Sequence, residues 1–418
     1  MTILIAGGGI AGLTLGLTLH QIGVPFRIFE ASREIRPLGV GINLQPNAVR
    51  ELFDLGLESQ LDAIGVKTRQ YGFYSRLGRP IWEEPRGTWA GYAWPQYSVH
   101  RGRLQMLLLE ELLGRAGRDC VVTGARVTGF EGAADRAVLH LEGREAVAGE
   151  LIVAADGIHS AIRAQMVPEE GPPIWGGAIL WRATSRAAPF FGGGAMALAG
   201  HDSQRIVAYP IGPTDPETGL AEINWIAELR TDPGEGWRKE DWNRAADIND
   251  FLPAFADWRF DWLDVPALIR GAAEVFEYPM VDRDPLPRWT YGGVSLMGDA
   301  AHPTYPVGSN GASQAVIDAR MIGASLLAHG VTPEALAAYE AEVRPVTTGV
   351  GLANRGSGPD AILQRVEDLC GGDFDDIEQV IPRADLAAHA ARYKALAGFS
   401  VEALNARPRL IPQGARLG

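Results

Sequence analysis

The opening of the chain constrains its fold more than any other feature. Residues 3–12, ILIAGGGIAG, place four glycines in and after a short apolar run, and the first charged residue is Arg27. Residues 2–6 have the composition of a strand buried on both faces of a parallel sheet. Apolar residues recur at helical spacing over 10–22, Gly23 is a stop signal, and residues 25–30 form a second apolar run. The sequence therefore predicts a strand, a tight turn, a helix and a second strand.

The turn in this unit has the spacing G-x-G-x-x-G, made by Gly7, Gly9 and Gly12 around Ile10 and Ala11. In that context the glycines allow a pyrophosphate to approach backbone N–H groups at the helix N-terminus. Glu30 ends the second strand, where it is placed to bind a ribose hydroxyl and would repel a 2′-phosphate. The bound nucleotide is thus predicted to be FAD or NAD, not NADP. The weaker alternative is that the glycines only make a turn.

Composition excludes several other functions. The chain has 418 residues, 46% of them hydrophobic, and a net charge of −13, so it is long enough for two or three domains and disfavours nucleic acid or anionic lipid as partners. Cys120 and Cys370 are far apart and outside any C-x-x-C, which argues against disulfide and zinc sites and predicts a reducing, cytoplasmic location. A positively charged leader and a run of about 18 apolar residues are both missing, so neither a signal peptide nor a membrane span is expected.

Two later motifs each place an acid at the carboxyl end of an apolar run. Residues 151–155 precede Asp156-Gly157, and residues 294–297 precede Gly298-Asp299. Nucleotides bind at the carboxyl ends of parallel strands, so both acids are candidate cofactor ligands. For Asp156 an alternative of equal weight is that it only caps the helix that follows.

A helix is predicted from the residues SNG at 309–311 to Gly330, after the irregular loop 302–308. Its N-terminus carries unpaired N–H groups and partial positive charge, which would stabilise negative charge on a reduced flavin ring. Asn310 could equally be an ordinary N-cap, and the two roles are compatible.

Taken in order, these three motifs resemble the signature of the FAD-dependent, single-component aromatic hydroxylases of the p-hydroxybenzoate hydroxylase fold. Within that family the chain looks most like the 5-methylphenazine-1-carboxylate 1-monooxygenases. The similar segments are 33–49, 83–87, 95–106, 155–163, 241–244, 250–258 and 278–287. Beyond about residue 350 the resemblance is weakest.

The resemblance implies roles for particular residues. Arg103 would reach the ribityl or pyrophosphate part of FAD, and Asp156 and Asp299 would hold the same region. Residues 40–42, with Val40 and Gly41, would pass near the isoalloxazine ring. The loop 305–311 would lie against the reactive edge of the ring, with these residues: Tyr305, Pro306, Gly308, Asn310 and Gly311.

The expected architecture is α/β, with a discontinuous Rossmann-like FAD-binding domain formed by 1–70, 98–172 and 284–350. Partial apolar alternation in 70–84, 176–185, 203–211 and 221–230 predicts a mostly antiparallel sheet in an inserted substrate domain, 71–97 and 173–283. Helices are expected over 237–262, where Trp237, Trp242, Trp258 and Trp262 are packing residues. The stretch GGGAMA at 192–197 is predicted to be a loop and not a second nucleotide fold. Residues 351–418 are expected to be helical, with a poorly ordered tail.

The predicted function is that of an FAD-dependent monooxygenase. NADH or NADPH, bound transiently, would reduce FAD; the reduced flavin would combine with O2; and the C4a-hydroperoxyflavin would deliver oxygen to an aromatic or heteroaromatic ring. A phenazine-carboxylate-like substrate would be hydroxylated with loss of CO2. Because the flavin carries the chemistry, no catalytic side chain and no metal site are predicted, and His302 and His159 are expected to be structural. A monomer or homodimer is expected.

The substrate is expected between the flavin and the inserted sheet. The candidate wall residues are aromatic or apolar: Trp181, Met196, Tyr209, Trp225, Tyr305 and Pro306. Either Arg182 or Arg205 would meet a substrate carboxylate. Two alternatives stay open: a flavin dehydrogenase or reductase on the same scaffold that inserts no oxygen, and a non-catalytic FAD-binding protein.

Overall fold

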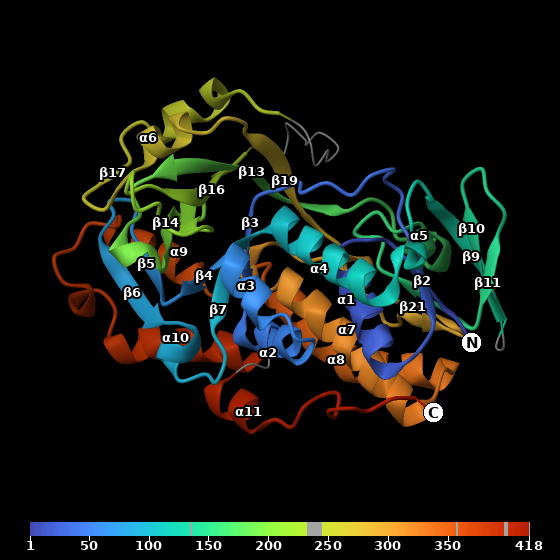
Figure 1. Ribbon diagram of the computed structural model, residues 1–418. Helices are drawn as coiled ribbons and strands as arrows, with labels where there is room; N and C mark the ends of the chain where they lie inside the picture. The colour runs from blue at the N-terminus through green and yellow to red at the C-terminus, as the bar shows by residue number, and fades with distance from the viewer. Residues whose placement is uncertain (134–135, 232–244, 357, 397–399, 418) are drawn as a thin grey trace.

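A parallel sheet flanked by helices organises the N-terminal and central parts of the chain. The computed structural model describes residues 1–133, 136–231, 245–356, 358–396 and 400–417 (Figure 1). The sheet has the order β20-β21-β12-β1-β2-β8, and only β20 runs antiparallel to its neighbour. Its strands are β1 (Ile3–Ala6), β2 (Phe26–Phe29), β8 (Val121–Val122), β12 (Leu151–Ala154), β20 (Thr290–Tyr291) and β21 (Val294–Leu296).

Four long helices pack with this sheet. They are α1 (Ile10–Ile22), α4 (Arg101–Ala116), α7 (Gly311–His329) and α8 (Pro333–Ala353). Helix α1 contacts both α4 and α7, and α7 contacts α8. Helix α1 ends as predicted, because Gly23 adopts a left-handed conformation with φ of 77°. Every residue of β1 and β12 is buried, which explains their uninterrupted apolar sequences.

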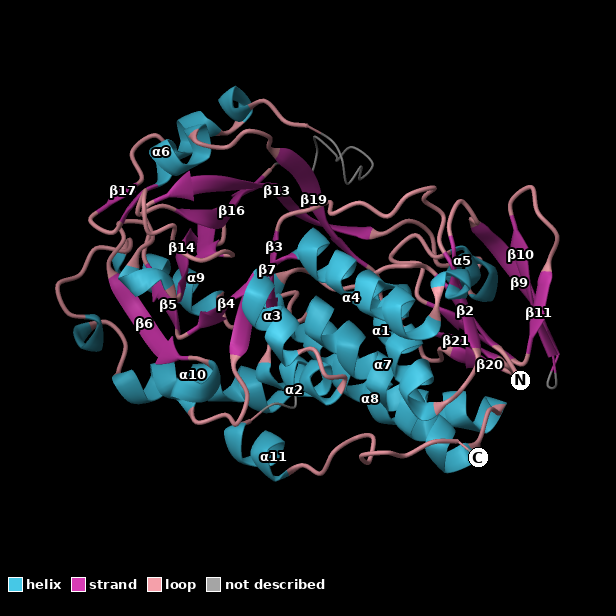
Figure 2. Ribbon diagram, in the orientation of Figure 1, coloured by secondary structure: helices cyan, strands magenta, loops and turns pink. Residues whose placement is uncertain are grey.

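The second large sheet has seven strands in the order β19-β13-β16-β15-β14-β5-β6 (Figure 2). It is antiparallel except where β14 pairs with β5. Its strands are β5 (Gln70–Tyr74), β6 (Pro80–Pro85), β13 (Ile174–Ala187), β14 (Ala195–His201), β15 (Gln204–Pro210), β16 (Ala221–Arg230) and β19 (Phe276–Asp282). These segments are the inserted ones predicted to form a mostly antiparallel sheet. The exact domain boundaries stay a prediction.

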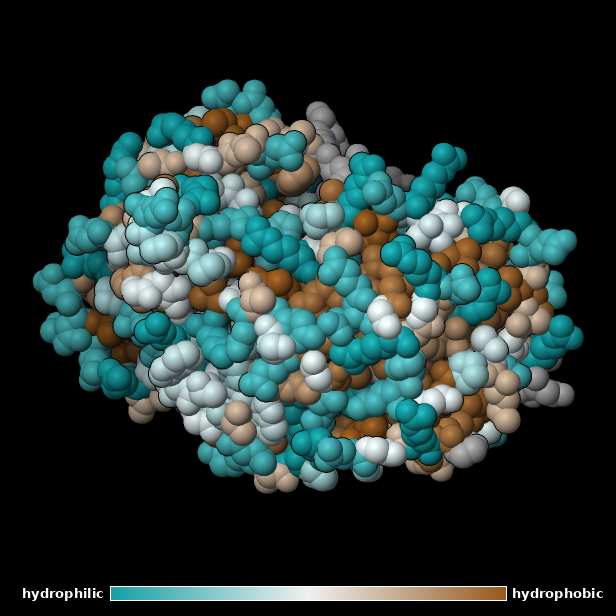
Figure 3. Space-filling model, viewed as in Figure 1, coloured by the Kyte–Doolittle hydropathy of each residue, from teal (hydrophilic) through white to brown (hydrophobic). Residues whose placement is uncertain are grey.

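Smaller elements join and cover the two sheets. An antiparallel sheet of β3 (Gly41–Leu44), β7 (Gln96–His100) and β4 (Gly65–Thr68) lies between them with α2 (Pro46–Asp54) and α3 (Glu58–Ile64) (Figure 1). A second small sheet lies beside α5 (Ala161–Met166) and contains β9 (Val127–Ala133), β10 (Arg136–Leu141) and β11 (Val147–Gly149). On the face in Figure 3, hydrophilic residues cover most of the surface and apolar groups are scattered among them.

The prediction of helices over 237–262 is wrong where the structure describes that stretch. Trp237 and Trp242 lie outside the described residues. The rest forms short 3-10 turns at Ile248–Asp250 and Leu252–Phe255, followed by the strand pair β17 (Arg259–Phe260) and β18 (Leu263–Asp264). A helix, α6 (Val265–Arg270), starts only where Asp264 caps it by accepting from the Ala267 N–H at 2.9 Å. The prediction of a loop over 192–197 is confirmed only for 192–194, because Ala195 to Ala197 form the start of β14.

The C-terminal region is helical, with α9 (Ala361–Cys370), α10 (Arg383–Leu396) and α11 (Val401–Ala406). The expectation of a poorly ordered tail is wrong, because the tail packs on the parallel-sheet side of the molecule. Ile411 is only 2% exposed, and the Leu417 N–H donates to the Ile22 carbonyl at 2.8 Å. Among the described helices, none is both long and apolar enough to cross a membrane.

Candidate active site

The glycine turn after β1 is as tight as its sequence predicts. Gly7 has a φ of 102°, and a Cβ there would collide with the carbonyl of Ala155, which follows β12. A Cβ on Gly12 would collide with the carbonyl of Gly7. Gly9 differs, because no heavy atom lies within 4 Å of a Cβ placed on it. Two glycines therefore close the turn, and the third leaves open space at the N-terminus of α1.

Glu30 is fixed against this turn by two backbone donors. Its carboxylate accepts from the N–H of Gly8 at 2.8 Å and from the N–H of Ser32 at 2.7 Å. The acid at the end of β2 is therefore held beside the glycine turn, as the fingerprint requires. Its contact with a ribose hydroxyl stays a prediction.

The two acids predicted from the later motifs follow the neighbouring strands β12 and β21. Asp156 accepts from the N–H of Ala161 through Oδ2 at 3.0 Å, while its buried Oδ1 has no hydrogen-bond partner among the described residues. Burial raises the pKa of the Asp156 carboxyl. The structure thus supports both roles considered for this residue: one oxygen caps a helix, and the other is available.

Asp299 is solvent-accessible, although protein surrounds it closely enough for desolvation to raise its pKa against the lowering effect of His302. His302 itself contacts Asp318, with Nε2 2.6 Å from Oδ2, and that same oxygen accepts from the Gly298 N–H at 2.8 Å. His302 therefore holds the loop around Asp299, in line with the predicted structural role.

The loop before α7 is held in place from behind. The Asn354 side chain, at the C-terminus of α8, donates to Thr304 Oγ1 at 3.1 Å and to the carbonyls of Tyr305 at 3.3 Å and Val307 at 3.1 Å. Gly308 and Ser309 have positive φ values of 71° and 52°. Such conformations are uncommon outside glycine, so Ser309 marks a backbone shape imposed by its surroundings.

The helix that follows begins beside this loop. Asn310 makes no side-chain cap, and its buried Oδ1 has no hydrogen-bond partner among the described residues. A Cβ on Gly311 would meet nothing within 4 Å. The N-terminus of α7 therefore faces open space, as expected for a ligand-facing helix end.

The segment at Val40 and Gly41 lies against the seven-stranded sheet. Val40 is buried, and the Gly41 N–H donates to Asn224 Oδ1 at 2.6 Å. A Cβ on Gly41 would lie 2.8 Å from the Tyr209 ring. The Arg182 guanidinium lies 3.4 Å from the Gly41 carbonyl, and its buried Nε has no acceptor among the described residues.

Arg103 forms an ion pair across to the seven-stranded sheet. It lies in the first turn of α4 and pairs with Glu222 of β16 at 2.6 Å, with 44% of its side chain exposed. The pair links the helix to the seven-stranded sheet. A contact between Arg103 and FAD would require this ion pair to open or to share the arginine, and that contact stays a prediction.

A cavity lies between the loop before α7, the seven-stranded sheet and the C-terminal helices. Gly308 and Ser309 line one side of it. Tyr71, Phe73, Trp82 and Met196 provide an aromatic and apolar wall, and the polar lining residues are Gln45, Glu84, Arg86, Gln96, His389 and Lys394.

Strand register divides the predicted wall residues between the two faces of the sheet. Met196 lines the cavity, and Tyr209 lies on the same face beside Gly41. Trp181 and Trp225 lie on the opposite face, where both rings pack with Phe251, at centroid distances of 4.6 and 6.2 Å. The expectation that these two tryptophans line the substrate site is therefore wrong. Successive side chains of a strand point to opposite faces of the sheet, and both tryptophans point away from the face that carries Met196.

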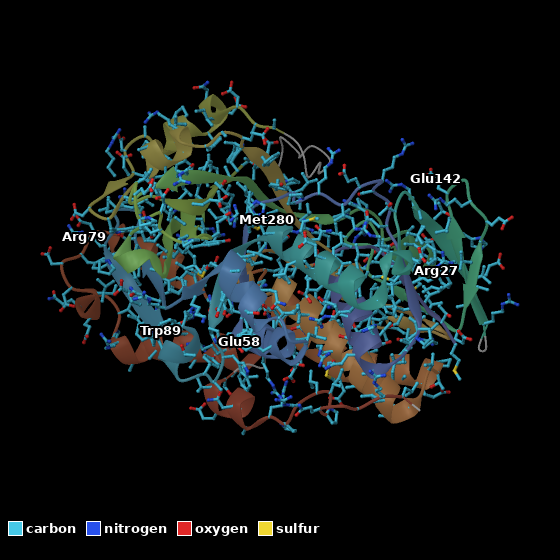
Figure 4. The ribbon with its side chains drawn as sticks, viewed as in Figure 1. Arg27, Glu58, Arg79, Trp89, Glu142 and Met280 are labelled. Atoms are coloured by element: carbon cyan, nitrogen blue, oxygen red, sulfur yellow. The ribbon has the colours of Figure 1, made fainter. Side chains whose placement is uncertain are left out.

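The remaining candidates also separate. Tyr305 is buried against β13 and β19 rather than in the cavity, while Pro306 is exposed. Figure 4 shows Met280, which packs in the same cluster as Tyr305, near the middle of the molecule and Arg79 toward the β6 end. Arg205 is not available to a ligand, since it pairs with Glu228 and Asp360. Of the two predicted arginines, only Arg182 keeps a free donor.

Several cavity residues were missed because their sequence context gives no signal. Gln45 and Gln96 are almost fully buried, and each has a side-chain oxygen without a partner among the described residues. Glu84 and Arg86 lie at the end of an edge strand and Lys394 on α10. The segment 83–87, which contains Glu84 and Arg86, carried part of the family resemblance, and this was the one sequence signal for these two residues.

The residues around the glycine turn and the loop before α7 fit a bound FAD. Several buried polar atoms without a hydrogen-bond partner among the described residues belong to these segments or to the strands beside them, on these side chains: Gln45, Asp156, Arg182 and Asn310. Buried polar groups normally have partners, so these atoms have hydrogen-bonding capacity that a bound polar molecule would use. Open space at Gly9 and Gly311 provides the room that a diphosphate and a ring need.

Comparison with known proteins agrees with this geometry. Residues 1–351 match the FAD binding domain family. Phenazine 1,6-dicarboxylic acid hydroxylase PhzS of Lysobacter antibioticus is 44% identical over 84% of this chain and 89% of its own length. The 3-amino-4-hydroxybenzoate 2-monooxygenase of Streptomyces cremeus is 32% identical over 83% and 84%. Klebsiella pneumoniae HpxO, solved with FAD and uric acid, has the same fold, with a TM-score of 0.70, 22% identity and coverage of 96% and 94%.

Proposed function

Because this chain belongs to the FAD binding domain family and is an FAD-dependent aromatic monooxygenase, we propose that its substrate is a planar aromatic heterocycle carrying a carboxylate, of the phenazine type. The single observation that carries this choice is the aromatic-walled cavity beside Gly308 and Ser309. Its wall of Tyr71, Phe73 and Trp82 suits a flat fused ring system. The 44% identity to a phenazine dicarboxylate hydroxylase supports the same substrate class.

FAD, when bound, supplies the redox chemistry, taking hydride from NADH or NADPH and activating O2 for transfer of one oxygen atom to the ring. The chain positions the reactants. The turn at Gly7–Gly12, Glu30, Asp156 and Asp299 would bind the nucleotide part of the cofactor. The N-terminus of α7 would offer backbone N–H groups and partial positive charge to the ring that accepts electrons.

The cavity walls have two further tasks. They orient the aromatic ring and they keep bulk water away from the reacting atoms. The loop held by Asn354 forms the boundary between the cofactor side and the cavity. An acid–base pair among the side chains is not needed for this scheme, and loss of CO2 would follow if oxygen enters at a carboxylate-bearing carbon.

The test is a substrate screen with the FAD-loaded protein. Phenazines, phenols and aromatic acids are tested one by one for stimulated NAD(P)H oxidation and O2 uptake, and products are weighed by mass spectrometry. We expect phenazine carboxylates to stimulate both and to give a product with one added oxygen, with or without loss of CO2. Oxidation of NAD(P)H without oxygen in any product would favour the dehydrogenase or reductase alternative.

We further propose that the protein acts in the cytoplasm as a monomer or homodimer. Both cysteines, Cys120 and Cys370, are unpaired thiols, which supports a reducing environment. Thiol titration with and without reductant, and light scattering of the purified holoprotein, test these two points.

A further inference from the structure

Two cations share a single carboxylate at one end of the cavity. Glu84 Oε1 lies 2.7 Å from a guanidinium nitrogen of Arg86, and Glu84 Oε2 lies 2.8 Å from Lys394 Nζ. The three side chains are 7%, 12% and 23% exposed, respectively, and all three line the cavity. Burial acts to raise the pKa of Glu84, but the two cations outweigh it and lower that pKa, so the carboxylate is ionised at neutral pH. This group therefore carries one uncompensated positive charge.

Arg86 also keeps an unused donor. Its buried Nε–H has no acceptor among the described residues, and its guanidinium lies over the Tyr71 ring with 5.0 Å between the Cζ atom and the ring centroid. An unpaired donor on a buried cation is costly, because buried polar groups normally have hydrogen-bond partners. An additional acceptor near this end of the cavity would remove that cost.

Strand register places this end of the cavity relative to the cofactor side. Glu84 lies opposite Tyr71, and Tyr71 lies opposite Met196, so the three side chains share one face and one row. Continuing the same register across β14 and β15 leads to Tyr209, which lies opposite Asn224, the residue bonded to Gly41. Neighbouring strands are about 4.8 Å apart, so Glu84 and Met196 are separated by roughly 10 Å.

That separation suits a flat aromatic molecule lying along the row. One end would lie by the loop before α7, at Gly308 and Ser309, and the other by Arg86 and Lys394. One of the two cations, Lys394, comes from α10, in the C-terminal region where sequence resemblance to the family is weakest. Helix α10 reaches the cavity through these residues: Leu386, His389, Ala390 and Lys394.

We propose that Arg86 and Lys394 form a subsite for a carboxylate substituent of the aromatic substrate, at the end of the cavity away from the loop before α7. The subsite makes the enzyme selective for anionic over neutral aromatic rings. Glu84 holds the two cations in place and reduces their attraction for the substrate carboxylate. This inference rests on the proposed function in taking the cavity as the substrate site.

Ligand binding by the FAD-loaded protein tests the subsite without turnover. Phenazine-1-carboxylate and unsubstituted phenazine are titrated while flavin absorbance and tryptophan fluorescence are followed. We expect the wild type to bind the carboxylate at least tenfold more tightly. Arg86→Gln and Lys394→Gln should each weaken carboxylate binding by roughly tenfold to a hundredfold, the effect of losing one charged hydrogen bond, and change phenazine binding less than about twofold.

Two further variants sharpen the test. Arg392→Gln removes an exposed arginine of the same helix that does not line the cavity, and it should leave both affinities unchanged. The effect of Glu84→Gln on carboxylate affinity should be opposite to that of Arg86→Gln. It should strengthen carboxylate binding, because the carboxylate that competes for the two cations is removed. Thermal unfolding of each variant shows whether it is folded. Lys394 is the most exposed of the three residues, so we expect Lys394→Gln to disturb folding least.

The proposal is overturned if the wild type binds the two ligands equally, or if Lys394→Gln weakens both ligands in parallel. It is also overturned if Glu84→Gln, shown to be folded, weakens carboxylate binding as Arg86→Gln does. Failure of the proposed function would look different: the charge-dependent binding would persist, while none of the aromatic compounds stimulated NAD(P)H oxidation or gained oxygen.

Discussion

At the scale of single residues, the glycines of the first turn show how one motif serves two purposes. Gly7 and Gly12 have backbone carbonyls where a side chain would be, whereas Gly9 has open space. The first two glycines are needed for the turn to close, and the third is needed only if something else approaches. Apoprotein stability and FAD affinity should therefore respond differently to substitution at these positions.

Gly12→Ala should destabilise the apoprotein by roughly 1–3 kcal/mol, because its Cβ overlaps the Gly7 carbonyl. Gly9→Ala should leave apoprotein stability unchanged within about 0.5 kcal/mol and weaken FAD binding by about tenfold or more. Chemical denaturation of the apoprotein and flavin fluorescence titration measure the two effects. Unchanged FAD affinity in Gly9→Ala would show that the cofactor does not approach this turn.

His302 gives a prediction about pH. Burial alone would lower the pKa of the ring, but contact with Asp318, aided by Asp299, outweighs burial and raises it. A group whose pKa is higher in the folded state stabilises the fold fully below its unfolded value, about 6.5, and loses that contribution as pH rises through the folded pKa.

His302→Gln should therefore lower the free energy of unfolding most below about pH 6.5, and the difference from wild type should shrink as the pH rises above that value. Denaturation with urea at a series of pH values measures it. Mutating His140, a half-buried histidine of β10 that lies 3.2 Å from Glu131, to Gln is the control. A wild-type to His302→Gln difference that grows with pH would contradict the ion-pair assignment.

At the scale of elements, the loop before α7 depends on a helix that follows it in sequence. One side-chain amide at the end of α8 donates to three acceptors on residues 304–307. The positive φ of Ser309 is kept within the same segment. Loop shape is therefore set by the docking of α8 and not by the loop sequence alone.

Asn354→Ala should release this loop and lower the free energy of unfolding by roughly 1–3 kcal/mol. Asn354→Asp should lower it further, because it places a carboxylate, which only accepts, against three acceptors. We expect faster amide hydrogen exchange over 304–310 and less hydroxylated product per NAD(P)H consumed, because a looser loop admits water. Asn405→Ala, which removes an amide bonded to the backbone near Gly91, is the matched control. Normal exchange and coupling in Asn354→Ala would refute the positioning role.

At the scale of the whole molecule, the C-terminal region closes both functional parts of the protein. Helices α9 and α10 complete the cavity against the edge of the seven-stranded sheet. The final segment returns to the first helix, with Ile411 buried near Gly323 of α7 and Leu417 bonded to Ile22. The two chain ends lie close together as a result (Figure 1).

Ile411→Ala should lower the free energy of unfolding by about 2–4 kcal/mol, the usual range for an emptied buried isoleucine site. Leu369→Ala removes a leucine that is 57% exposed on α9 and should change stability by less than about 0.5 kcal/mol. Equilibrium unfolding of the two variants makes the comparison. Equal effects would mean that the final segment is not part of the core.

The sequence by itself determined the elements whose cause is local. The turn at Gly7–Gly12, the strand ending at Glu30, the acids after β12 and β21, and helix α7 with its open N-terminus all follow from spacing within one short stretch. Backbone geometry, helix capping and strand polarity act over a few residues, so their signals survive in a single chain.

Only the tertiary structure decided which residues share the cavity. Strand register put Met196 on one face and Trp181 and Trp225 on the other, and ion pairing removed Arg205 as a ligand while Arg182 kept a donor. Lys394 entered the cavity from α10, far away in sequence from Arg86. The physical reason is that pairing between distant strands and helices fixes the direction of every side chain, and a shift of one residue would reverse it.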